Sequence, residues 1–169
     1  LRTGFIDTLI SMGANIKIDN LETIRNEKVG RVIVKGDGEL NPCSISKEKI
    51  PRMIDEIPIL ALICAHTKGR SVIGGLEELR HKESDRLLGI YNILLDMGVG
   101  IDRPSNDSIA IKGENKLYNT NKLNNFNDHR LAMMISCAQI LSENEVLFDD
   151  CIDTSFPDFK NLISRILTD

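Results

Sequence analysis

The sequence predicts an α/β (α+β) domain that contains about two copies of one βαβαββ-like unit. Two observations predict this fold class. Segments with a helical spacing of apolar residues alternate with short strand-like runs along the whole chain. A helix that ends in Met-Gly and is followed by a strand also occurs twice, at residues 12–13 and at residues 97–98. The first copy of the unit lacks its front part.

The sequence of the first half of the chain predicts two helices and three strands. Apolar residues at helical spacing indicate a helix over residues 3–12. A second helix starts at Asp55, and because residues 57–65 are apolar on all sides, this helix should be buried. The strands are expected at residues 14–18, 29–35 and 71–73.

The second half repeats this pattern. Ser84 or Asp85 can cap the next helix, and a second all-apolar helix spans residues 128–141. A last, amphipathic helix opens at residues 155–157. The strands are expected at residues 99–102, 108–112 and 146–148, and the first two of them should form a hairpin.

The composition excludes several classes of partner. The chain has 169 residues, of which 41% are hydrophobic and 27% charged, as in an ordinary folded domain. A net charge of -4, only 4% aromatic residues and no Trp argue against a surface for nucleic acid. No segment reaches the roughly 18 consecutive apolar residues of a membrane span. We therefore expect neither a nucleic-acid nor a membrane partner, and any anion site must be local.

The four cysteines lie far apart and form no Cys-x-x-Cys pair. Cys64 and Cys137 stand in apolar runs, which is typical of small core residues. This distribution favours a reducing compartment and argues against a zinc site. The chain begins with Leu1 rather than Met, so we expect its natural N-terminus to be missing.

A charged run, Lys82-Glu83-Ser84-Asp85-Arg86, stands at the mouth of the third predicted helix. Lys82 and Arg86 are four residues apart, so they can meet where the free N–H groups of a helix favour an anion. Two cations there could bind a phosphate or carboxylate, and Glu83 is a candidate proton carrier. The alternative is a solvated charged turn, which is the commoner meaning of such a run.

Asp128-His129-Arg130 and Asp55 stand at two further helix N-termini. Arg130 would point to whatever binds there and His129 could transfer a proton, or both could be surface residues of a capped helix. Asp55 would either cap its helix or accept a proton from a substrate hydroxyl. Equivalent helix ends of a repeated unit can converge on one face, so the three groups together predict one composite site.

Four ordered motifs resemble one enzyme family. They occupy residues 53–61, 75–87, 127–133 and 154–159. Together with Arg2-Thr3-Gly4 upstream, they resemble the C-terminal part of the 5-enolpyruvylshikimate-3-phosphate (EPSP) synthase family, and they are most similar to its bacterial glyphosate-tolerant type. The resemblance covers essentially the whole chain.

The resemblance implies an enolpyruvyl transferase-like fold, an inside-out α/β barrel, in a two-domain enzyme of more than twice this length. The active site would lie between the domains. The implied reaction moves the carboxyvinyl group of phosphoenolpyruvate to the 5-hydroxyl of shikimate 3-phosphate through a tetrahedral intermediate and releases phosphate, on the shikimate pathway to chorismate. No metal or organic cofactor is implied. The implied partners are the two substrates and the N-terminal portion of the same enzyme, in a cytoplasmic monomer.

The same resemblance assigns roles to six residues. Asp55 would hold or deprotonate the shikimate hydroxyl, and Glu83 would transfer a proton near the methylene group of phosphoenolpyruvate. Lys82 would contact the shikimate portion and the intermediate. The residues that would bind phosphoenolpyruvate are Arg86 and Arg130, with His129 in support.

Two positions depart from the family pattern. Thr154 stands where many relatives have Lys, and Glu78 stands where many have Asn, which puts both substrate contacts in doubt. The motifs of the other domain are absent. We expect residues 1–169 to be the C-terminal portion of one domain, in which residues 1–50 end a truncated unit and residues 51–169 form the remaining unit and the final helix.

Two alternatives remain open. UDP-N-acetylglucosamine enolpyruvyl transferase shares the fold and phosphoenolpyruvate, but the Lys-Glu-Ser-Asp-Arg and Asp-His-Arg runs fit it poorly. A non-catalytic domain of the same fold is the other alternative, against which Asp55, Glu83, Arg86 and Arg130 all count. Because half a cleft cannot enclose two anionic substrates, the chain by itself is predicted to be inactive.

Overall fold

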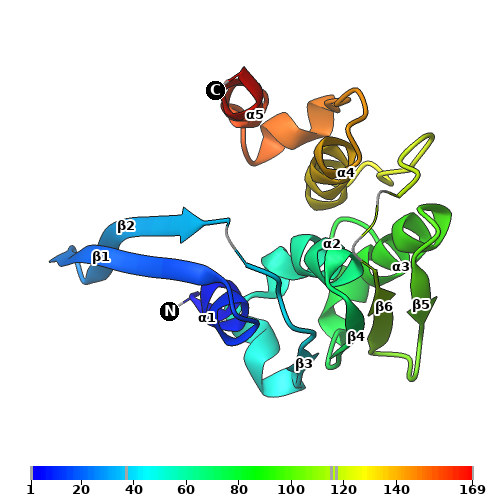
Figure 1. Cartoon of the computed structure of the whole chain (residues 1–169), viewed down its shortest axis with the longest axis horizontal. Helices are drawn as coiled ribbons and strands as arrows, with labels where there is room; N and C mark the ends of the chain where they lie inside the picture. Colours follow the sequence, from blue (N-terminus) through cyan, green and yellow to red (C-terminus); the bar gives the residue numbers. More distant parts are fainter. Residues whose placement is uncertain (1, 37, 115, 117, 169) are drawn as a thin grey trace.

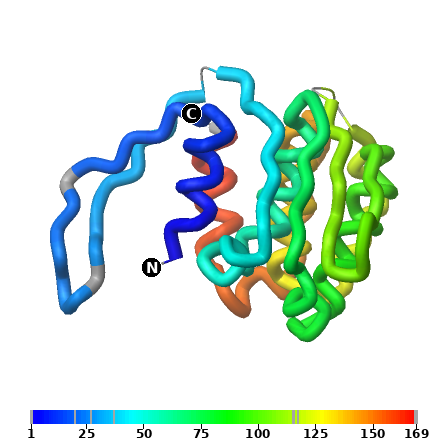
Figure 2. The backbone as a smooth tube through the Cα atoms, turned by 90° about the horizontal axis from the view of Figure 1, so that it is seen from below, coloured from blue at the N-terminus to red at the C-terminus, as the bar shows by residue number. Residues whose placement is uncertain are grey.

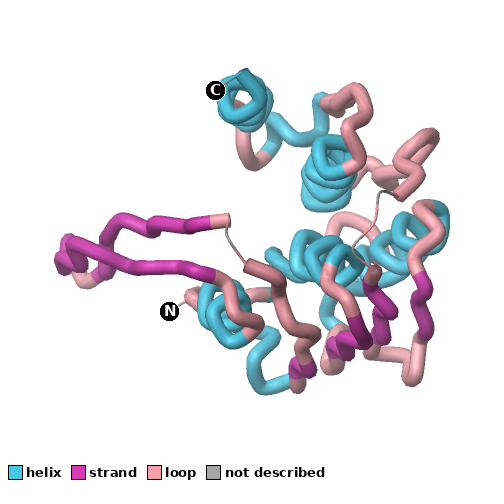
Figure 3. The backbone as a smooth tube through the Cα atoms, viewed as in Figure 1, coloured by secondary structure: helices cyan, strands magenta, loops and turns pink. Residues whose placement is uncertain are grey.

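A computed structural model describes residues 2–36, 38–114, 116 and 118–168. The helices are α1 (Gly4–Ser11), α2 (Ile57–His66), α3 (Arg86–Asp96), α4 (His129–Leu141) and α5 (Phe159–Thr168). The strands are β1 (Asn15–Ile24), β2 (Glu27–Lys35), β3 (Ser44–Ile45), β4 (Gly69–Ile73), β5 (Gly100–Asp102) and β6 (Ile109–Gly113). The short 3-10 helices are η1 (Lys47–Arg52), η2 (Ile54–Glu56), η3 (Glu77–His81) and η4 (Asp150–Thr154). Figures 1 and 3 show how helices and strands alternate, as expected.

Four strands form one sheet in the order β3-β4-β6-β5. β3 pairs with β4 in parallel, whereas β6 pairs in an antiparallel manner with both β4 and β5. The β5–β6 pair is the expected hairpin. α2 contacts β6, α3 contacts β5, and α4 contacts both helices, so α4 lies on the side of α2 and α3 away from the strands (Figures 1 and 2). The main core lies between this sheet and the helices.

The helix α2 is buried because other elements surround it, and α4 is largely buried against α2, α3 and η4. α2 lies between the sheet and α4. Its fully buried residues include Ile57, Leu60, Ala61 and Leu62. α4 also contacts η4, and a second small apolar cluster forms there from Ala132, Ile152, Phe159 and Ile163. The expectation that the helix apolar on all sides at residues 57–65 is buried is confirmed.

The repeated unit is also confirmed, although its two copies have different surroundings. Each copy has a helix, a hairpin, a connecting segment and a buried helix: α1, β1–β2 and α2, then α3, β5–β6 and α4. The β1–β2 hairpin forms a two-stranded sheet of its own and extends away from the other elements (Figure 1). None of its described side chains is buried. Its exposed large apolar residues are Ile18, Leu21, Ile24, Val29, Val32 and Val34.

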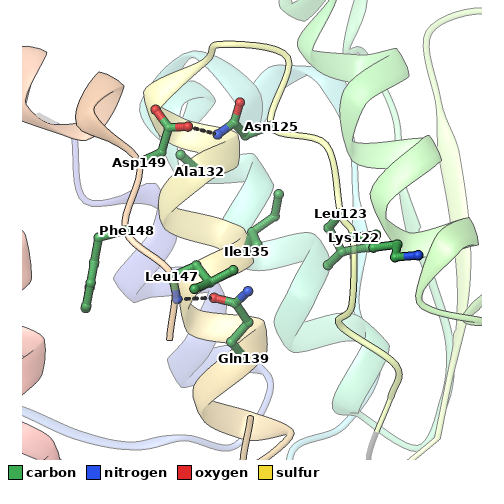
Figure 4. Close-up of a pocket in the computed structure, with 9 residues that line it drawn as sticks. All are labelled: Lys122, Leu123, Asn125, Ala132, Ile135, Gln139, Leu147, Phe148 and Asp149. Carbon is green, nitrogen blue, oxygen red and sulfur yellow. Dashed lines mark hydrogen bonds between the residues drawn. The ribbon is translucent and has the colours of Figure 1, made fainter. Parts of the chain in front are cut away.

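The prediction of a strand at residues 146–148 is wrong. These residues form no strand and instead run beside α4 (Figure 4). The backbone N–H of Leu147 donates to Oε1 of Gln139 over 2.8 Å, and Oγ of Ser136 donates to the carbonyl of Leu147 over 3.0 Å. Side chains of α4 therefore satisfy backbone groups that a sheet would otherwise pair. The segment helps to line a pocket of about 200 Å³, which none of the expected site residues borders (Figure 4).

Two helices begin later than the sequence predicts. Asp55 lies in η2, and α2 begins at Ile57, with Pro58 in its first turn. α5 begins at Phe159 rather than at residues 155–157. The later start of α5 has a physical cause, because the residue before a proline disfavours helical backbone angles and Pro157 stands within the expected start.

Gly89 allows α3 to approach α4 closely. A Cβ atom at this position would lie 2.4 Å from Cδ1 of Leu131, well inside normal contact. Gly89 stands three residues after Arg86, the first residue of α3. The close approach therefore brings Arg86 to the N-terminus of α4, where Asp128 lies.

Candidate functional site

Arg86 and Asp128 form a buried ion pair where α3 meets α4. Nε of Arg86 donates to Oδ2 of Asp128 over 3.0 Å, and the two side chains are 1% and 0% exposed. Oγ of Ser84 donates to the same carboxylate oxygen over 3.0 Å. Attraction between buried charges offsets their lost hydration only when further hydrogen bonds complete the geometry. The bond from Ser84 is one of these.

Asp128 also caps α4. Its Oδ1 accepts hydrogen bonds from the backbone N–H groups of Arg130, over 2.9 Å, and Leu131, over 3.3 Å. Burial by itself would raise the pKa of Asp128, but the hydrogen bond and charge of Arg86, with the Ser84 hydroxyl and the Arg130 N–H, hold that pKa below its usual value. Asp128 is therefore a fixed anion at neutral pH.

Acid should destabilise the chain partly through Asp128. Because its folded-state pKa lies below the unfolded value of about 3.9, its ion pair stabilises the fold above that pH and is lost as the pH falls through the folded-state pKa. We expect the urea midpoint of unfolding to fall between roughly pH 4 and pH 2, and to fall less in Asp128→Asn, which has no proton to take up. Equal pH slopes for the two proteins would contradict this role of Asp128.

Asp55 is surrounded by three arginines. Nη2 of Arg2 donates to Oδ2 of Asp55 over 2.8 Å. Nη1 of Arg86 lies 3.6 Å from Oδ1, and Nη2 of Arg130 lies 3.8 Å from Oδ2. Burial opposes ionisation, but the hydrogen bond from Arg2 and the charges of Arg130, Arg2 and Arg86 lower the pKa of Asp55. Asp55 is thus an ionised hydrogen-bond acceptor at the junction of the two repeats.

Glu83 and Lys82 lie beside this cluster and have different partners. Nη2 of Arg86 donates to Oε2 of Glu83, whose side chain is 54% exposed. Nζ of Lys82 donates instead to Oε1 of Glu78, over 2.7 Å. Glu83 therefore combines access from outside with contact to a buried guanidinium group, which suits a group that transfers protons.

The two arginines expected to bind an anion differ in access. The side chain of Arg86 is 1% exposed, and its guanidinium group meets the carboxylates of Asp128, Glu83 and Asp55. The side chain of Arg130 is 32% exposed and borders, with Asp55, a pocket of about 240 Å³. The apolar walls of this pocket are Pro58, Ile59, Met133, Met134, Cys137, Phe156 and Phe159. Of the two arginines, Arg130 is the more accessible to an anionic ligand.

The structure brings most of the expected residues together. Ion pairs join Asp55, Glu83, Arg86 and Arg130 into one cluster. His129 is half-buried at the first position of α4, next to Arg130, whereas the ammonium group of Lys82 is bound to Glu78. Nη1 of Arg80 lies 3.9 Å from Oδ2 of Asp85, and His81 is exposed.

Sequence reasoning missed two contributors and one role. Arg2 was noted only as part of an upstream family motif, yet it binds Asp55 directly. Ser84 or Asp85 was expected to cap α3; Asp85 caps that helix, and Ser84 instead binds Asp128. Asp128 was expected at a helix N-terminus, and the structure adds a second role, because its other carboxylate oxygen accepts a hydrogen bond from Arg86. All three contacts link residues more than 40 positions apart, so no local pattern could have indicated them.

The carboxylates of the site are paired with guanidinium groups rather than grouped for a metal ion. Within the described residues, no set of three or more His, Cys, Asp or Glu side chains is arranged to hold a metal. In the same part of the chain, no helix has both the length and the apolar character needed to cross a membrane.

Comparison of the sequence with known proteins gives a consistent result. A family model described as EPSP synthase (3-phosphoshikimate 1-carboxyvinyltransferase) matches residues 1–163. The 3-phosphoshikimate 1-carboxyvinyltransferases of Oceanobacillus iheyensis and Aquifex aeolicus are 40% and 36% identical to the chain over 168 residues. Each alignment covers 98% of this chain but 38% of the relative. The chain thus spans about two fifths of the length of these relatives.

The fold is also similar to a solved structure. EPSP synthase from Acinetobacter baumannii matches with a TM-score of 0.88 and 31% sequence identity. The match covers 97% of this chain and 38% of that chain, so it includes both copies of the repeated unit. It confirms the expected enolpyruvyl transferase-like, inside-out α/β fold.

Proposed function

Because the chain belongs to the EPSP synthase family, we propose that it forms the C-terminal portion of a 3-phosphoshikimate 1-carboxyvinyltransferase. The complete enzyme would transfer the carboxyvinyl group of phosphoenolpyruvate to the 5-hydroxyl of shikimate 3-phosphate and release phosphate. The observation that carries the proposal is the cluster of Asp55, Glu83, Arg86 and Arg130, which reach one place from three helix N-termini. Fixed guanidinium groups beside carboxylates suit a reaction between dense anions that also moves protons.

Arg130 and Arg86 would bind phosphoenolpyruvate in this proposal. Arg130 supports it because its side chain is partly exposed at the mouth of a pocket. Arg86 is already paired with three carboxylates, so its contact with the substrate would replace its bond to Glu83 or its ion pair with Asp55. His129 would support Arg130 from the first turn of α4.

Asp55 and Glu83 would move the protons. In the addition step, Glu83 gives a proton to the methylene carbon of phosphoenolpyruvate while the 5-hydroxyl oxygen attacks the neighbouring carbon and its proton passes to Asp55. In the elimination step, the C–O bond to phosphate breaks, Glu83 takes a proton back from the methyl group, and the proton held by Asp55 leaves with the phosphate. The low pKa of Asp55 favours orienting the hydroxyl over removing its proton early, because a weak base takes a proton only late in bond formation.

Lys82 would contact the shikimate portion of the substrate and of the intermediate. Its ammonium group is bound to Glu78, one of the two positions that depart from the family pattern, and its remaining N–H donors would contact the substrate. Thr154, at the other such position, donates its hydroxyl to the carbonyl of Cys151 over 2.6 Å. The division of the chain at residue 50 stays a prediction.

The chain by itself should not turn over the two substrates. We expect no phosphate release from phosphoenolpyruvate and shikimate 3-phosphate with the purified chain, because one side of a cleft cannot enclose both anions. Fused behind the upstream part of the Oceanobacillus iheyensis relative, in place of that relative's own C-terminal portion, the chain should restore phosphate release.

Two variants of the fusion protein make this test specific. Asp55→Ala should abolish the restored turnover, whereas Asp102→Ala, a change of an exposed aspartate in β5, should leave it intact. A folded fusion protein without turnover would contradict the proposed function. Turnover with UDP-N-acetylglucosamine in place of shikimate 3-phosphate, by the complete enzyme that contains this chain, would favour the rival transferase.

We also propose that the complete enzyme is a monomer and that it is located in the cytoplasm. These two parts of the proposal rest on the family resemblance alone.

A further inference from the structure

Two of the four cysteines meet in the structure although 21 positions separate them in the chain. Sγ of Cys43 lies 3.6 Å from Sγ of Cys64, in hydrogen-bond contact. Cys43 directly precedes β3, and Cys64 lies in α2. Both thiols are free. A disulfide bond requires the sulfurs to approach to about 2.05 Å, so side-chain rotation has little distance to close.

The backbone around Cys43 is fixed against the neighbouring strand. The N–H of Cys43 donates to Oγ of Ser71 over 3.1 Å, and the carbonyl of Cys43 accepts from the N–H of Val72 over 2.9 Å. Cys64 is fully buried within α2, whereas Cys43 is partly exposed. Cys43 is therefore the more accessible residue of the pair.

The two thiols also differ in acidity. The hydrogen bond from Cys64, helped by the Ser71 hydroxyl and the charge of Lys49, outweighs burial and lowers the pKa of Cys43 to about 7. The same hydrogen bond and burial raise the pKa of Cys64. Cys43 is thus the nucleophilic thiol near neutral pH, and Cys64 keeps its proton.

We propose that Cys43 and Cys64 form a peroxide-sensitive dithiol that closes to a disulfide bond between the β3 segment and α2. The Cys43 thiolate attacks one oxygen of hydrogen peroxide, the O–O bond breaks, and Cys43 becomes a sulfenic acid as hydroxide leaves. The Cys64 sulfur then attacks the Cys43 sulfur, the S–O bond breaks, and the Cys64 proton leaves with the departing oxygen as water. Overall, two thiols and one peroxide give one disulfide and two waters.

The disulfide bond would close a ring of chain that contains Asp55. The ring runs through η1 and η2 to α2, and Asp55 lies in η2. A cross-link of this kind restricts the unfolded chain and removes freedom from the segment it encloses. Oxidation would therefore tie the segment that carries an expected catalytic carboxylate to the sheet.

Tryptic peptides identify this disulfide bond unambiguously. Cleavage after Lys and Arg places Cys43 in residues 36–47 and Cys64 in residues 53–68, while residues 131–160 carry both other cysteines. The purified chain would be treated with a small excess of hydrogen peroxide, alkylated and digested without reduction. We expect a linked pair of peptides 36–47 and 53–68, an intact chain lighter by about 2 Da, and reversal by dithiothreitol. The oxidised chain should also melt roughly 5 °C or more above the reduced chain.

Two variants test the order of the steps. Cys64→Ser should leave Cys43 as a sulfenic acid that dimedone captures on peptide 36–47, and Cys43→Ser should leave Cys64 unmodified at the same peroxide dose. Circular dichroism would show that each variant is folded. The proposal fails if the linkage includes peptide 131–160, if two chains become linked, or if Cys43 proceeds to sulfinic acid while Cys64 stays reduced.

Discussion

Replacing Asp128 by alanine should lower the free energy of unfolding by about 3–5 kcal/mol, because the change leaves Arg86 charged, buried and without its main partner. The cap of α4 is lost in the same change, because Asp128 accepts from two backbone N–H groups. The measurement is urea unfolding at neutral pH, followed by circular dichroism.

Asp85→Ala is the matched control for this change. Asp85 caps α3, because its Oδ1 accepts a hydrogen bond from the backbone N–H of Leu88 over 2.9 Å. Its side chain is partly exposed, and its Oδ2 lies 3.9 Å from Nη1 of Arg80. Its loss should cost about 1 kcal/mol, the usual value of a cap. The difference between the two variants isolates the buried ion pair. If Asp128→Ala costs no more than Asp85→Ala, Asp128 acts only as a helix cap.

Glu83→Gln should lower kcat of the complete enzyme by about 10²–10⁴-fold, the usual range for loss of a proton-transfer group. Gln has nearly the same shape as Glu, and its amide oxygen can accept the hydrogen bond that Arg86 donates to Glu83. It cannot carry a proton to carbon, so KM for both substrates should change far less than kcat. The measurement is steady-state phosphate release.

Glu78→Gln provides the comparison within the same segment. Glu78 is an exposed carboxylate in η3, and its described partner is Lys82 rather than the arginine cluster. We expect kcat to change less than about 10-fold in this variant. A Glu83→Gln enzyme with unchanged kcat would remove Glu83 from the chemistry and leave it as a partner of Arg86.

The helices of this fold could be predicted because their signals are local. A run that is apolar on all sides has to be buried, and α2 and α4 are surrounded by other elements. Asp85 and Asp128 were expected at the N-termini they cap. β3 could not be predicted, because a strand of two residues carries no periodicity. The strand at residues 146–148 was wrong because its short apolar run packs along α4 and bonds to side chains of that helix.

The sequence predicted which residues form the site better than it predicted how they are buried and paired. The sequence placed Arg86 at the open mouth of a helix, but the structure buries it beneath carboxylates from two other segments. Burial of this kind depends on the crossing of α3 and α4, which Gly89 permits and which no spacing of charged residues shows. The contact of Cys43 with Cys64 depends likewise on how β3 lies against α2.

The β1–β2 hairpin gives the chain a route to self-association. Among the described strands, β1 and β2 form a two-stranded sheet of their own, so its outer edges can take up a further strand. Exposed Ile and Val side chains along the hairpin would add apolar contact to such pairing. The hairpin also carries charged residues of both signs, and charged side chains along a sheet edge disfavour such pairing. We expect added salt to promote self-association of this chain, because salt screens these charges while the apolar side chains stay exposed.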